Sequence, residues 1–493
     1  MQQLVFPLDG IPSLAMPYVN QKVNPMAISR LFEKAKERNV DLHAFEVYKD
    51  NELLIRMSLP PYDCTDKTHY YSLSKSFVST AVGLACDEGL LSVDDRIVEL
   101  FPDKCPETVS ENMAKCTVGH VLAMDSGLHR ESFSKVNPAD DVLAAFLDGN
   151  FEYEPGTHFH YDTGATTFLA AIVQKVTGYS VFDYLDMKMF RYMNMRDIYW
   201  FTTHDGTVQG GVGFHGSCDD AAKLGLLYLN RGMWNGRRIL SEEWVDAASR
   251  VHSDNRGFND WIDWNSGYCY QFWRNSRGGY RGDGASGQYS IIMPDKNMVV
   301  AGLNESGNLQ NVVDILTELS DEVFGDFGGS CDPVALARDF YALEKTQAPQ
   351  FEEDNYYLLE ENRFHLHSVR FINEPENLCV QFSNGSTHFG IRAGAGRWLR
   401  NQFTIGAMTD TTPYHSPVSE QTRGTAAAFT NADGVLTVTL RSLSQPLHQE
   451  LKFMFDGDDL TIEVGKMPPL PPKAMQDPYM VKKLNNIVKG KKL

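Results

Sequence analysis

The sequence predicts an α+β protein with more than one domain. Its 493 residues exceed what a single hydrophobic core ordinarily holds. Helical and strand patterns are mixed over roughly the first 325 residues, whereas short strand patterns follow one another from residue 356 onward. We therefore expect a mixed domain at residues 1–330, a linker at 331–355 and a small antiparallel β-domain at 356–467.

The elements of the first domain can be assigned from periodicity. Residues 25–39 have the pattern of an amphipathic helix, and residues 43–58 that of two strands around a turn at Lys49-Asp50-Asn51. A helix is expected at 72–90, because its apolar side chains recur at helical spacing and Gly89 can end it. The other strand candidates are Gly267–Arg274, Gln288–Pro294 and 297–303.

The β-domain is predicted from repeated short segments of alternating polarity. They are Phe364–Phe371, Leu378–Phe382, Thr387–Arg392, Thr425–Thr430, Val435–Arg441, Glu450–Phe455 and Asp459–Val464. Asn-Gly and Asp-Gly dipeptides separate several of them, which is typical of a meander or a small barrel. Residues 468–493 are rich in proline and lysine and are expected to form a solvated or loosely docked tail.

Charge and cysteine usage exclude some classes of function. A formal net charge of −19 argues against a nucleic-acid partner, which needs a basic face. We see no apolar stretch long enough to span a membrane and no signal-peptide pattern in Met1–Asn20. The eight cysteines include no CxxC pair, so we expect reduced thiols and a cytoplasmic protein. The oligomeric state stays open.

A Ser-x-x-Lys pattern occurs twice, at Ser72–Lys75 and at Ser132–Lys135. The first opens an apolar helix, where residues three apart share a face, so the lysine would lie beside the serine hydroxyl. The helix N-terminus there would also favour developing negative charge. The second runs into Pro138, which discourages a helix across the pair. Only the first pattern therefore predicts a nucleophile.

The first pattern, read with its surroundings, resembles a known family. Ser72-Leu73-Ser74-Lys75 is similar to the nucleophile motif of the serine β-lactamase and penicillin-binding protein superfamily, in its class C-like branch. Asp125-Ser126-Gly127-Leu128 resembles the family's Ser-Gly-Leu segment, and Tyr161-Asp162-Thr163 its second catalytic motif, usually Tyr-x-Asn. The resemblance runs in order over roughly residues 30–320. It implies an antiparallel sheet flanked by helices, a helical region beside it, and no metal or organic cofactor.

The resemblance also implies catalytic roles. Ser72 would be the nucleophile and Lys75 its neighbour in proton transfer, since a serine hydroxyl needs a base. Tyr161 would act as general base in acylation and as proton donor to the leaving group. The backbone N–H groups of Ser72 and Ala285 would form the oxyanion hole. Lys75 and Tyr161 would titrate as a coupled pair, so the resting position of their proton stays open.

Two departures from the family pattern bear on the substrate. Thr163 stands where asparagine is common, and a hydroxyl cannot hold a substrate amide as a carboxamide does. The third motif, usually Lys-Thr-Gly or His-x-Gly, corresponds to Gly282-Asp283-Gly284, which offers no cation for a substrate carboxylate. Arg281 could replace that cation only if the backbone turned it inward. These substitutions weigh against β-lactam hydrolysis and leave ester or amide substrates open.

Three other patterns are read as coincidental or structural. Gly282–Gly287 matches GxGxxG, but a strand and not a helix follows it, which argues against a dinucleotide site. Arg281-Gly282-Asp283 spells an adhesion tripeptide without a secretion signal. His158 and His160 are attributed to packing or substrate contact, because no HExxH or cysteine pair accompanies them.

The sequence thus predicts a serine hydrolase that cleaves a small ester or amide through an acyl-enzyme on Ser72. The alternatives are a non-hydrolytic, penicillin-binding-like ligand-binding protein and a true β-lactamase. Aromatic residues near the third motif are candidates for a substrate pocket or for core: Tyr268, Tyr270, Trp273, Tyr280 and Tyr289. The β-domain is expected either to narrow the active-site cleft or to serve stability or oligomerisation.

Overall fold

The computed structural model divides into two compact units. It describes residues 17–344, 346–347, 349–352, 355–362, 364–386, 388–401, 424–446, 448–465 and 487–493. The first unit comprises residues 1–58 and 64–334, and the second 59–63 and 335–493. The boundary at residue 334 falls inside the short helix α13 (Pro333–Asp339), within the predicted linker. That residues 59–63 belong with the C-terminal unit was not predicted.

An antiparallel seven-stranded sheet forms the centre of the first unit. Its strands, in spatial order, are β1 (Tyr18–Val19), β3 (Glu52–Ser58), β2 (Asp41–Lys49), β12 (Met298–Glu305), β11 (Gln288–Met293), β10 (Tyr280–Gly284) and β9 (Trp273–Arg274). The strands predicted at 43–58, 288–294 and 297–303 are confirmed. Strand β10, which carries the third motif, was not predicted as a strand.

The strand predicted at 267–274 is wrong over most of its length, since only Trp273 and Arg274 pair as a strand. Gly267 and Gln271 have positive φ values of 108° and 64°, which interrupt an extended chain. The carbonyls of Gln271 and Tyr270 accept hydrogen bonds from hydroxyl groups of the neighbouring helix, at 2.9 and 2.8 Å. This segment is therefore shaped by that helix and not by a sheet partner.

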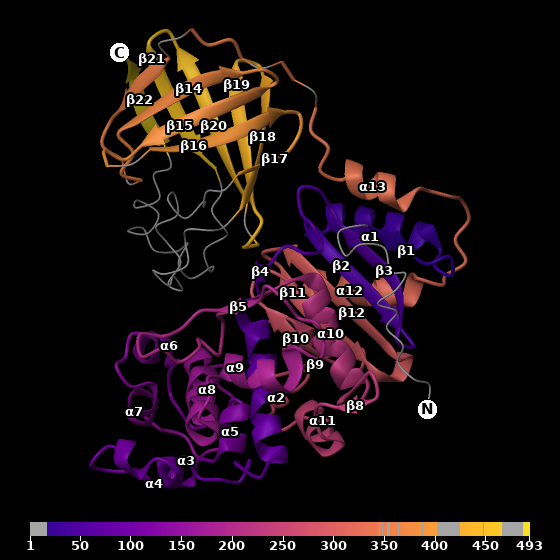
Figure 1. Ribbon diagram of the computed structural model, residues 1–493, viewed down its shortest axis with the longest axis vertical. Helices are drawn as coiled ribbons and strands as arrows, with labels where there is room; N and C mark the ends of the chain where they lie inside the picture. Colours follow the sequence, from indigo (N-terminus) through magenta and orange to yellow (C-terminus); the bar gives the residue numbers. More distant parts are fainter. Residues whose placement is uncertain are drawn as a thin grey trace. The chain divides into compact units, whose positions relative to one another are not determined.

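Helices cover both faces of the sheet (Figure 1). Gly225 of α10 (Cys218–Leu229) lies so close to Ser290 and Val299 that a Cβ there would be 2.7 Å from each. On the opposite face, a Cβ on Gly302 would be 2.9 Å from Leu316 of α12 (Leu309–Glu322). Helix α1 (Pro25–Glu37) packs beside α12, and the helix predicted at 25–39 is thereby confirmed.

The helical region is organised around α2 (Ser74–Asp87) and α8 (Thr163–Thr177), which pack on each other. The smaller helices of this unit are α3 (Ile97–Leu100), α4 (Glu111–Lys115), α5 (Val118–Leu122), α6 (Phe133–Val136), α7 (Val142–Leu147), α9 (Val181–Leu185) and α11 (Glu242–Ser249). Helix α2 is buried over nearly its whole length, because the helical region covers one side and the sheet the other. Among the described residues, no helix is long and apolar enough to cross a bilayer.

Two small sheets complete the first unit. One joins β4 (Thr68–His69), β6 (Phe214–Gly216) and β5 (Tyr199–Trp200), and the other pairs β7 (Met233–Trp234) with β8 (Arg237–Arg238). The pairing of β4 with β6 holds the chain just before Ser72, since Tyr70 N–H also donates to the Phe214 carbonyl at 2.9 Å. The nucleophile segment is therefore fixed from its N-terminal side.

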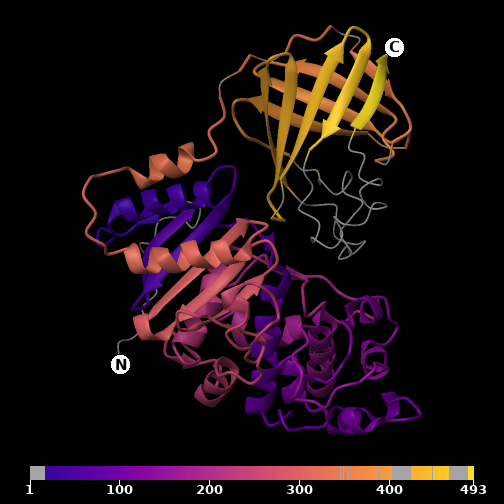
Figure 2. The same cartoon turned by 180° about the vertical axis from the view of Figure 1, so that it is seen from behind.

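The second unit is a β-barrel, best seen from the two opposite views in Figures 1 and 2. Its strands, in spatial order, are β16 (His388–Ala395), β15 (Asn377–Ser383), β14 (Ser368–Glu374), β13 (Tyr356–Leu359), β22 (Ile487–Lys492), β21 (Asp459–Val464), β20 (His448–Asp456), β19 (Val435–Ser442), β18 (Thr425–Ala432) and β17 (Leu399–Asn401). A parallel pairing of β16 with β18 closes the sheet. The predicted antiparallel β-domain is confirmed.

The end of the predicted tail is part of this barrel. Residues 487–492 form β22, which pairs with β13 on one side and β21 on the other. The prediction of a loosely docked tail is wrong for these residues, because alternate side chains such as Val488 are buried in the barrel core. Residues 468–486 of the predicted tail lie outside the described residues.

A short N-terminal segment also packs within the second unit. Tyr62 is buried against Ala426 and Leu443, and its hydroxyl accepts a hydrogen bond from Arg441 at 3.4 Å. Arg400 donates to the Pro61 carbonyl at 2.9 Å. The link between β3 and β4 is therefore held by barrel side chains, which local sequence patterns cannot reveal.

Candidate active site

Ser72 lies in a single 3₁₀ turn, Tyr71–Leu73, that leads directly into α2. The sequence predicted that the helix itself would begin at residue 72. The difference arises at Tyr71, whose φ of 47° is rare for a bulky side chain and bends the chain sharply before the serine. Tyr70 is fully buried and its hydroxyl donates to the Ser217 carbonyl. The turn thus presents a half-buried Ser72 at the start of a buried helix.

Lys75 lies beside the Ser72 hydroxyl, as the spacing predicted. Its Nζ is 3.0 Å from Ser72 Oγ, 2.7 Å from the Gly211 carbonyl oxygen and 3.5 Å from Thr163 Oγ1. The side chain is 1% exposed. Burial lowers the pKa of Lys75 to about 7, although Glu131, Asp162 and Asp283 partly oppose this shift. A substantial fraction of Lys75 is therefore neutral near pH 7 and able to accept a proton.

Tyr161 lies against Lys75 within an aromatic group. Lys75 Nζ is 4.8 Å from the centre of the Tyr161 ring. The ring stacks on Trp273, with centroids 5.2 Å apart, and meets Tyr268 edge to face at 6.0 Å. Phe258, which is 42% exposed, lies 6.2 Å from Tyr161 and 5.6 Å from Trp273. We call these four residues the aromatic wall.

Thr163 is the first residue of α8, and Asp162 caps that helix by accepting from Gly164 N–H at 2.9 Å. Asp162 also accepts hydrogen bonds from the Ser132 N–H and hydroxyl, at 2.9 and 2.8 Å. Burial raises the pKa of Asp162, and these donors oppose the shift. Asp162 therefore fixes the start of α8, so that Thr163 faces Lys75 and Tyr161 directly precedes the cap.

The second Ser-x-x-Lys pattern is structural. Ser132 is bonded to Asp162, whereas Lys135 Nζ is 2.6 Å from an oxygen of Asp148 and is largely exposed. A four-residue helix, α6, does form over residues 133–136, contrary to the expectation drawn from Pro138. This helix does not bring the two side chains together, because Ser132 is bonded to Asp162 and Lys135 to Asp148.

Strand β10 brings the third motif against the nucleophile turn. A Cβ on Gly282 would lie 2.6 Å from Leu73 Cδ1 and from Ser76 Oγ. A Cβ on Gly284 would lie 2.0 Å from the Tyr70 carbonyl oxygen. Residue 284 must be glycine because the strand there touches the backbone of the turn, whereas at residue 282 a Cβ would meet side-chain atoms. Ala285 follows in an exposed turn, which is held by a Gly287 N–H to Gly284 carbonyl bond of 3.1 Å.

Arg281 does not turn toward Ser72. It pairs with Ile291 across β10 and β11, whereas Gly282 pairs with Ser290, so Arg281 and Gly282 point to opposite faces of the sheet. The guanidinium is 0% exposed and donates to Asp283 at 2.9 Å and to Asn275 at 2.9 Å. It also lies 4.2 Å from the Trp264 ring centre. The suggestion that Arg281 replaces the family's lysine is therefore wrong.

Three carboxylates act on the charge of Lys75, and all three accept hydrogen bonds. Asp283 is bonded to Arg281 and accepts from the Trp273 indole, while burial raises its pKa. Asp162 is bonded to Ser132 and to the start of α8. Glu131 is an exposed residue that forms no salt bridge with any described residue, and its carboxylate accepts hydrogen bonds from the N–H groups of Phe133 and Thr163. Partial burial of its carboxyl group raises its pKa, and nearby Asp162 adds to the shift.

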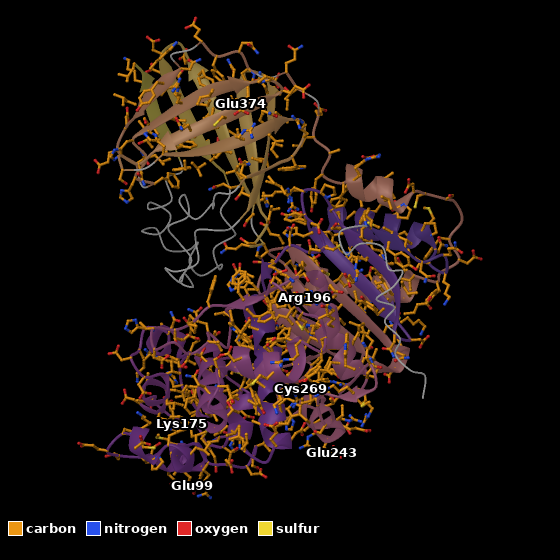
Figure 3. All side chains as sticks on the ribbon, viewed as in Figure 1. Glu99, Lys175, Arg196, Glu243, Cys269 and Glu374 are labelled. Atoms are coloured by element: carbon orange, nitrogen blue, oxygen red, sulfur yellow. The ribbon has the colours of Figure 1, made fainter. Side chains whose placement is uncertain are left out.

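The other candidates separate into site and core. Tyr268 and Trp273 belong to the aromatic wall. Tyr270 stacks on His252, Tyr280 packs on Phe272, and the Tyr289 hydroxyl bonds the Leu309 carbonyl, so these three are core residues. Figure 3 labels Cys269, which is buried next to the wall residue Tyr268.

His158 and His160 were expected to serve packing or substrate contact, and the structure shows a packing contact for His158. His158 stacks on Tyr153 at 4.1 Å, and the His160 N–H donates to the Met124 carbonyl at 2.7 Å. Among the described residues they belong to no group of ligand atoms close enough for a metal.

Sequence reasoning missed Gly211, Glu131 and Phe258. Gly211 contributes only a carbonyl, and no spacing rule connects it with Lys75, 136 residues away. Phe258 lies in a loop that Asn265 organises, accepting from the Gly257 and Phe258 N–H groups at 2.8 and 2.9 Å. An Asn-rich loop signals turns but not their destination.

Comparison with known proteins gives the same outline. The beta-lactamase family model matches residues 30–312. A 6-aminohexanoate-dimer hydrolase from Paenarthrobacter ureafaciens is 26% identical over 320 residues, covering 59% of this chain and 79% of that protein. The structure of a putative beta-lactamase from Bacteroides dorei matches with a TM-score of 0.52 at 14% identity, over 62% of this chain and 100% of that one.

A penicillin-binding protein homologue from Caulobacter crescentus matches with a TM-score of 0.51 at 15% identity, over 62% of this chain and 99% of that one. At such identities the two structures establish the fold alone. The family model spans more than half of the chain and includes every residue of the site just described. The first unit has the beta-lactamase/transpeptidase-like fold, and the chain belongs to the beta-lactamase family.

Proposed function

We propose that this protein is a serine hydrolase of the class C-like branch that cleaves a small ester or amide through an acyl-enzyme on Ser72. The observation that carries the proposal is the pair formed by Ser72 and Lys75. Their side chains are 3.0 Å apart, and burial lowers the pKa of Lys75 to about 7. A serine hydroxyl next to an amine that is partly neutral near pH 7 is an activated nucleophile.

In acylation, Ser72 Oγ attacks the substrate carbonyl carbon while its proton moves to Lys75 Nζ. The carbonyl oxygen becomes an oxyanion, and the N–H groups of Ser72 and Ala285 stabilise it. When the intermediate collapses, the carbon–oxygen or carbon–nitrogen bond breaks. The leaving alcohol or amine takes a proton from the Tyr161 hydroxyl, which regains one from Lys75. This gives Lys75 the proton removal first expected of Tyr161, because Lys75 is the group bonded to Ser72.

Deacylation repeats the proton path with water. Lys75, neutral again, accepts a proton from a water molecule as that water attacks the ester carbonyl of the acyl-enzyme. The bond between the acyl carbon and Ser72 Oγ breaks, and Ser72 Oγ takes the proton that Lys75 received from the water, so that Lys75 is neutral again. The Gly211 carbonyl, at 2.7 Å, keeps the amine directed at Ser72 during both steps. Thr163 lies at the start of α8, with its Oγ1 3.5 Å from the amine.

The names of similar proteins support the general class of hydrolase but not a particular substrate. The Paenarthrobacter ureafaciens relative is named as a hydrolase of a 6-aminohexanoate dimer. A family VIII carboxylesterase matches in fold with a TM-score of 0.50 at 15% identity. The acyl group and leaving group that this chain accepts are not fixed by these likenesses.

The test is a pre-steady-state experiment with 4-nitrophenyl esters of short acids. We expect a burst of nitrophenol equal to the enzyme concentration, and an acid-quenched protein heavier by one acyl group on the peptide that contains Ser72. A Ser132→Ala protein should give the same burst, because Ser132 is structural. No burst, no turnover and no added mass would show that the protein binds ligands without hydrolysing them.

A further inference from the structure

The charges around Ser72 are arranged unusually for a hydrolase of carboxylate-bearing substrates. Two cationic side chains have observed contacts at the nucleophile and at the third motif, Lys75 and Arg281. Lys75 is committed to Ser72 and to the Gly211 carbonyl. Arg281 is 0% exposed, so a bound substrate cannot reach it.

The strand that faces the nucleophile offers only backbone. Gly282 and Gly284 lie on one face of β10 together with Tyr280, and a Cβ on either glycine would be closer than 3.0 Å to atoms of the nucleophile turn or α2. Arg281 and Asp283 are on the opposite face and bind each other at 2.9 Å. Neither glycine offers a cation to a substrate, and a side chain at 284 would collide with the Tyr70 backbone.

Negative charge, by contrast, is available to a substrate. The Glu131 carboxylate accepts hydrogen bonds from the backbone N–H groups of Phe133 and Thr163. Because Thr163 Oγ1 is 3.5 Å from Lys75 Nζ, these bonds hold the carboxylate near the catalytic amine. Asp283 is paired with Arg281, but Glu131 forms no salt bridge with a described residue and is exposed. Glu131 immediately precedes Ser132, whose N–H donates to Asp162 at 2.9 Å, so its backbone is held beside the start of α8.

The aromatic wall adds a second attraction for cations. Tyr161 and Trp273 are stacked, and Phe258 extends the wall to the surface with 42% of its area exposed. Aromatic faces bind ammonium groups through their quadrupoles and bind neutral apolar chains through burial. They offer nothing to a carboxylate.

We propose that the site selects acyl substrates by charge, accepting cationic and neutral ones and rejecting anionic ones, with Glu131 as the specificity-determining residue. This inference rests on the proposed hydrolase function. The preferred substrate carries an ammonium group beside Glu131 and the aromatic wall. A β-lactam or peptide that must present a carboxylate is a poor substrate.

The test compares three 4-nitrophenyl esters of similar size: the hexanoate, the 5-(trimethylammonio)pentanoate and the monoester of adipic acid. The first is neutral, the second cationic and the third anionic. For each protein, kcat/KM with the charged esters is divided by its own value with the neutral ester. We expect the cationic ester to exceed the anionic one by about tenfold at low salt, with a smaller ratio at 0.5 M salt.

Two variants separate a local from a global effect. Glu131→Gln should reduce the ratio of cationic to anionic ester at least about threefold. Glu107→Gln removes the same charge from another exposed residue of the first unit and should leave the ratio unchanged. If both variants lowered the ratio equally, the overall charge of −19 and not Glu131 would set the preference.

The outcomes distinguish this inference from the function on which it rests. Hydrolysis of all three esters with equal or anion-favouring ratios would overturn charge selection and leave the serine hydrolase intact. If no ester were hydrolysed and Ser72 stayed unacylated, both proposals would fall together.

Discussion

The chain contains the Ser-x-x-Lys pattern twice, and only one of the two copies brings its lysine next to its serine. At Ser72–Lys75 the amine is 3.0 Å from the serine hydroxyl and 1% exposed. At Ser132–Lys135 the hydroxyl is 2.8 Å from Asp162, and the lysine is 2.6 Å from Asp148 at the surface. Both copies contain helix, so helical spacing alone does not make a nucleophile.

What differs is the surroundings of each lysine. Lys75 is enclosed by α8, β10 and the Gly211 carbonyl, so its charge is costly and its pKa falls to about 7. Lys135 is 46% exposed and keeps water and a carboxylate partner. Ser132 completes a helix cap, whereas Ser72 lies in a turn next to a strained Tyr71. The burial of Lys75 and the strained backbone at Tyr71, more than the motif itself, distinguish the proposed catalytic copy from the structural copy.

The largest effect should come from replacing each of the two serines, separately, with alanine. Ser72→Ala should lower kcat by about 10⁴-fold or more while the melting temperature stays close to that of the wild type. Ser132→Ala should retain most activity but lose about 1–3 kcal/mol of stability, because Asp162 loses a buried donor. Ester kinetics and thermal unfolding of both proteins check this. Equal loss of activity in the two would break the comparison.

Replacing each lysine with methionine should also have different effects. Loss of Lys75 should lower activity without lowering stability, whereas loss of Lys135 should change neither by much. Lys75→Met should reduce kcat/KM by about 10²–10⁴-fold. It should not lower the melting temperature, because it removes a buried ammonium whose desolvation opposes folding. Lys135→Met, at an exposed pair, should change stability by no more than about 0.5 kcal/mol and leave kcat/KM intact. A strongly destabilised Lys75→Met protein would contradict this account.

Alanine substitutions at Gly284 and Gly282 test the effect of strand β10 on the position of the nucleophile turn. Gly284→Ala should lower activity more than Gly282→Ala, because its Cβ meets the Tyr70 backbone while that of residue 282 meets ends of side chains. We expect losses of about 10²-fold and 10-fold respectively, since misplacement of a nucleophile by about 1 Å has effects of this size. Gly328→Ala is the control, as no atom lies within 4 Å of its Cβ position. Steady-state ester hydrolysis measures all three.

The pH dependence should give the smallest but most diagnostic effect. Burial lowers the pKa of Lys75 from 10.5 to about 7 in the folded state. Between these two values the unfolded chain binds more protons, so the free energy of unfolding should rise with pH, by at most about 1.4 kcal/mol per pH unit. The acylation rate should rise through pH 7 as the amine becomes neutral.

Denaturant titrations and single-turnover acylation from pH 6 to 9 check both changes. Lys75→Met should lose the pH dependence of stability that this lysine contributes, whereas Lys135→Met should keep it. An acylation rate that falls between pH 6 and 8 in the wild type would mean that Lys75 acts as its ammonium form.

The sequence was sufficient where the information is local. The helix at α1, the hairpin of β2 and β3, and the pairing of Ser72 with Lys75 all follow from periodicity or spacing of a few residues. The meander around the Asp-Gly turns was equally legible, because β-turn chemistry marks where each strand ends.

What could not be predicted depends on contacts between distant segments. Arg281 turns away from the site because Asp283, two residues on, shares its face of β10 and binds it. Strand β22 and the segment 59–63 join the barrel through partners more than a hundred residues away. Glu131 shows its relation to Lys75 only once α8 has brought them together. A single sequence carries no signal for such pairings.

The most direct test of the account is chemical labelling of the two serines. The wild-type protein is incubated with a fluorophosphonate, digested, and its peptides are weighed. We predict one phosphonyl group per chain on the Ser72 peptide, unchanged in Ser132→Ala and absent in Ser72→Ala. Labelling of Ser132, or labelling that survives in Ser72→Ala, would contradict the claim that burial beside Lys75 makes Ser72 the nucleophile.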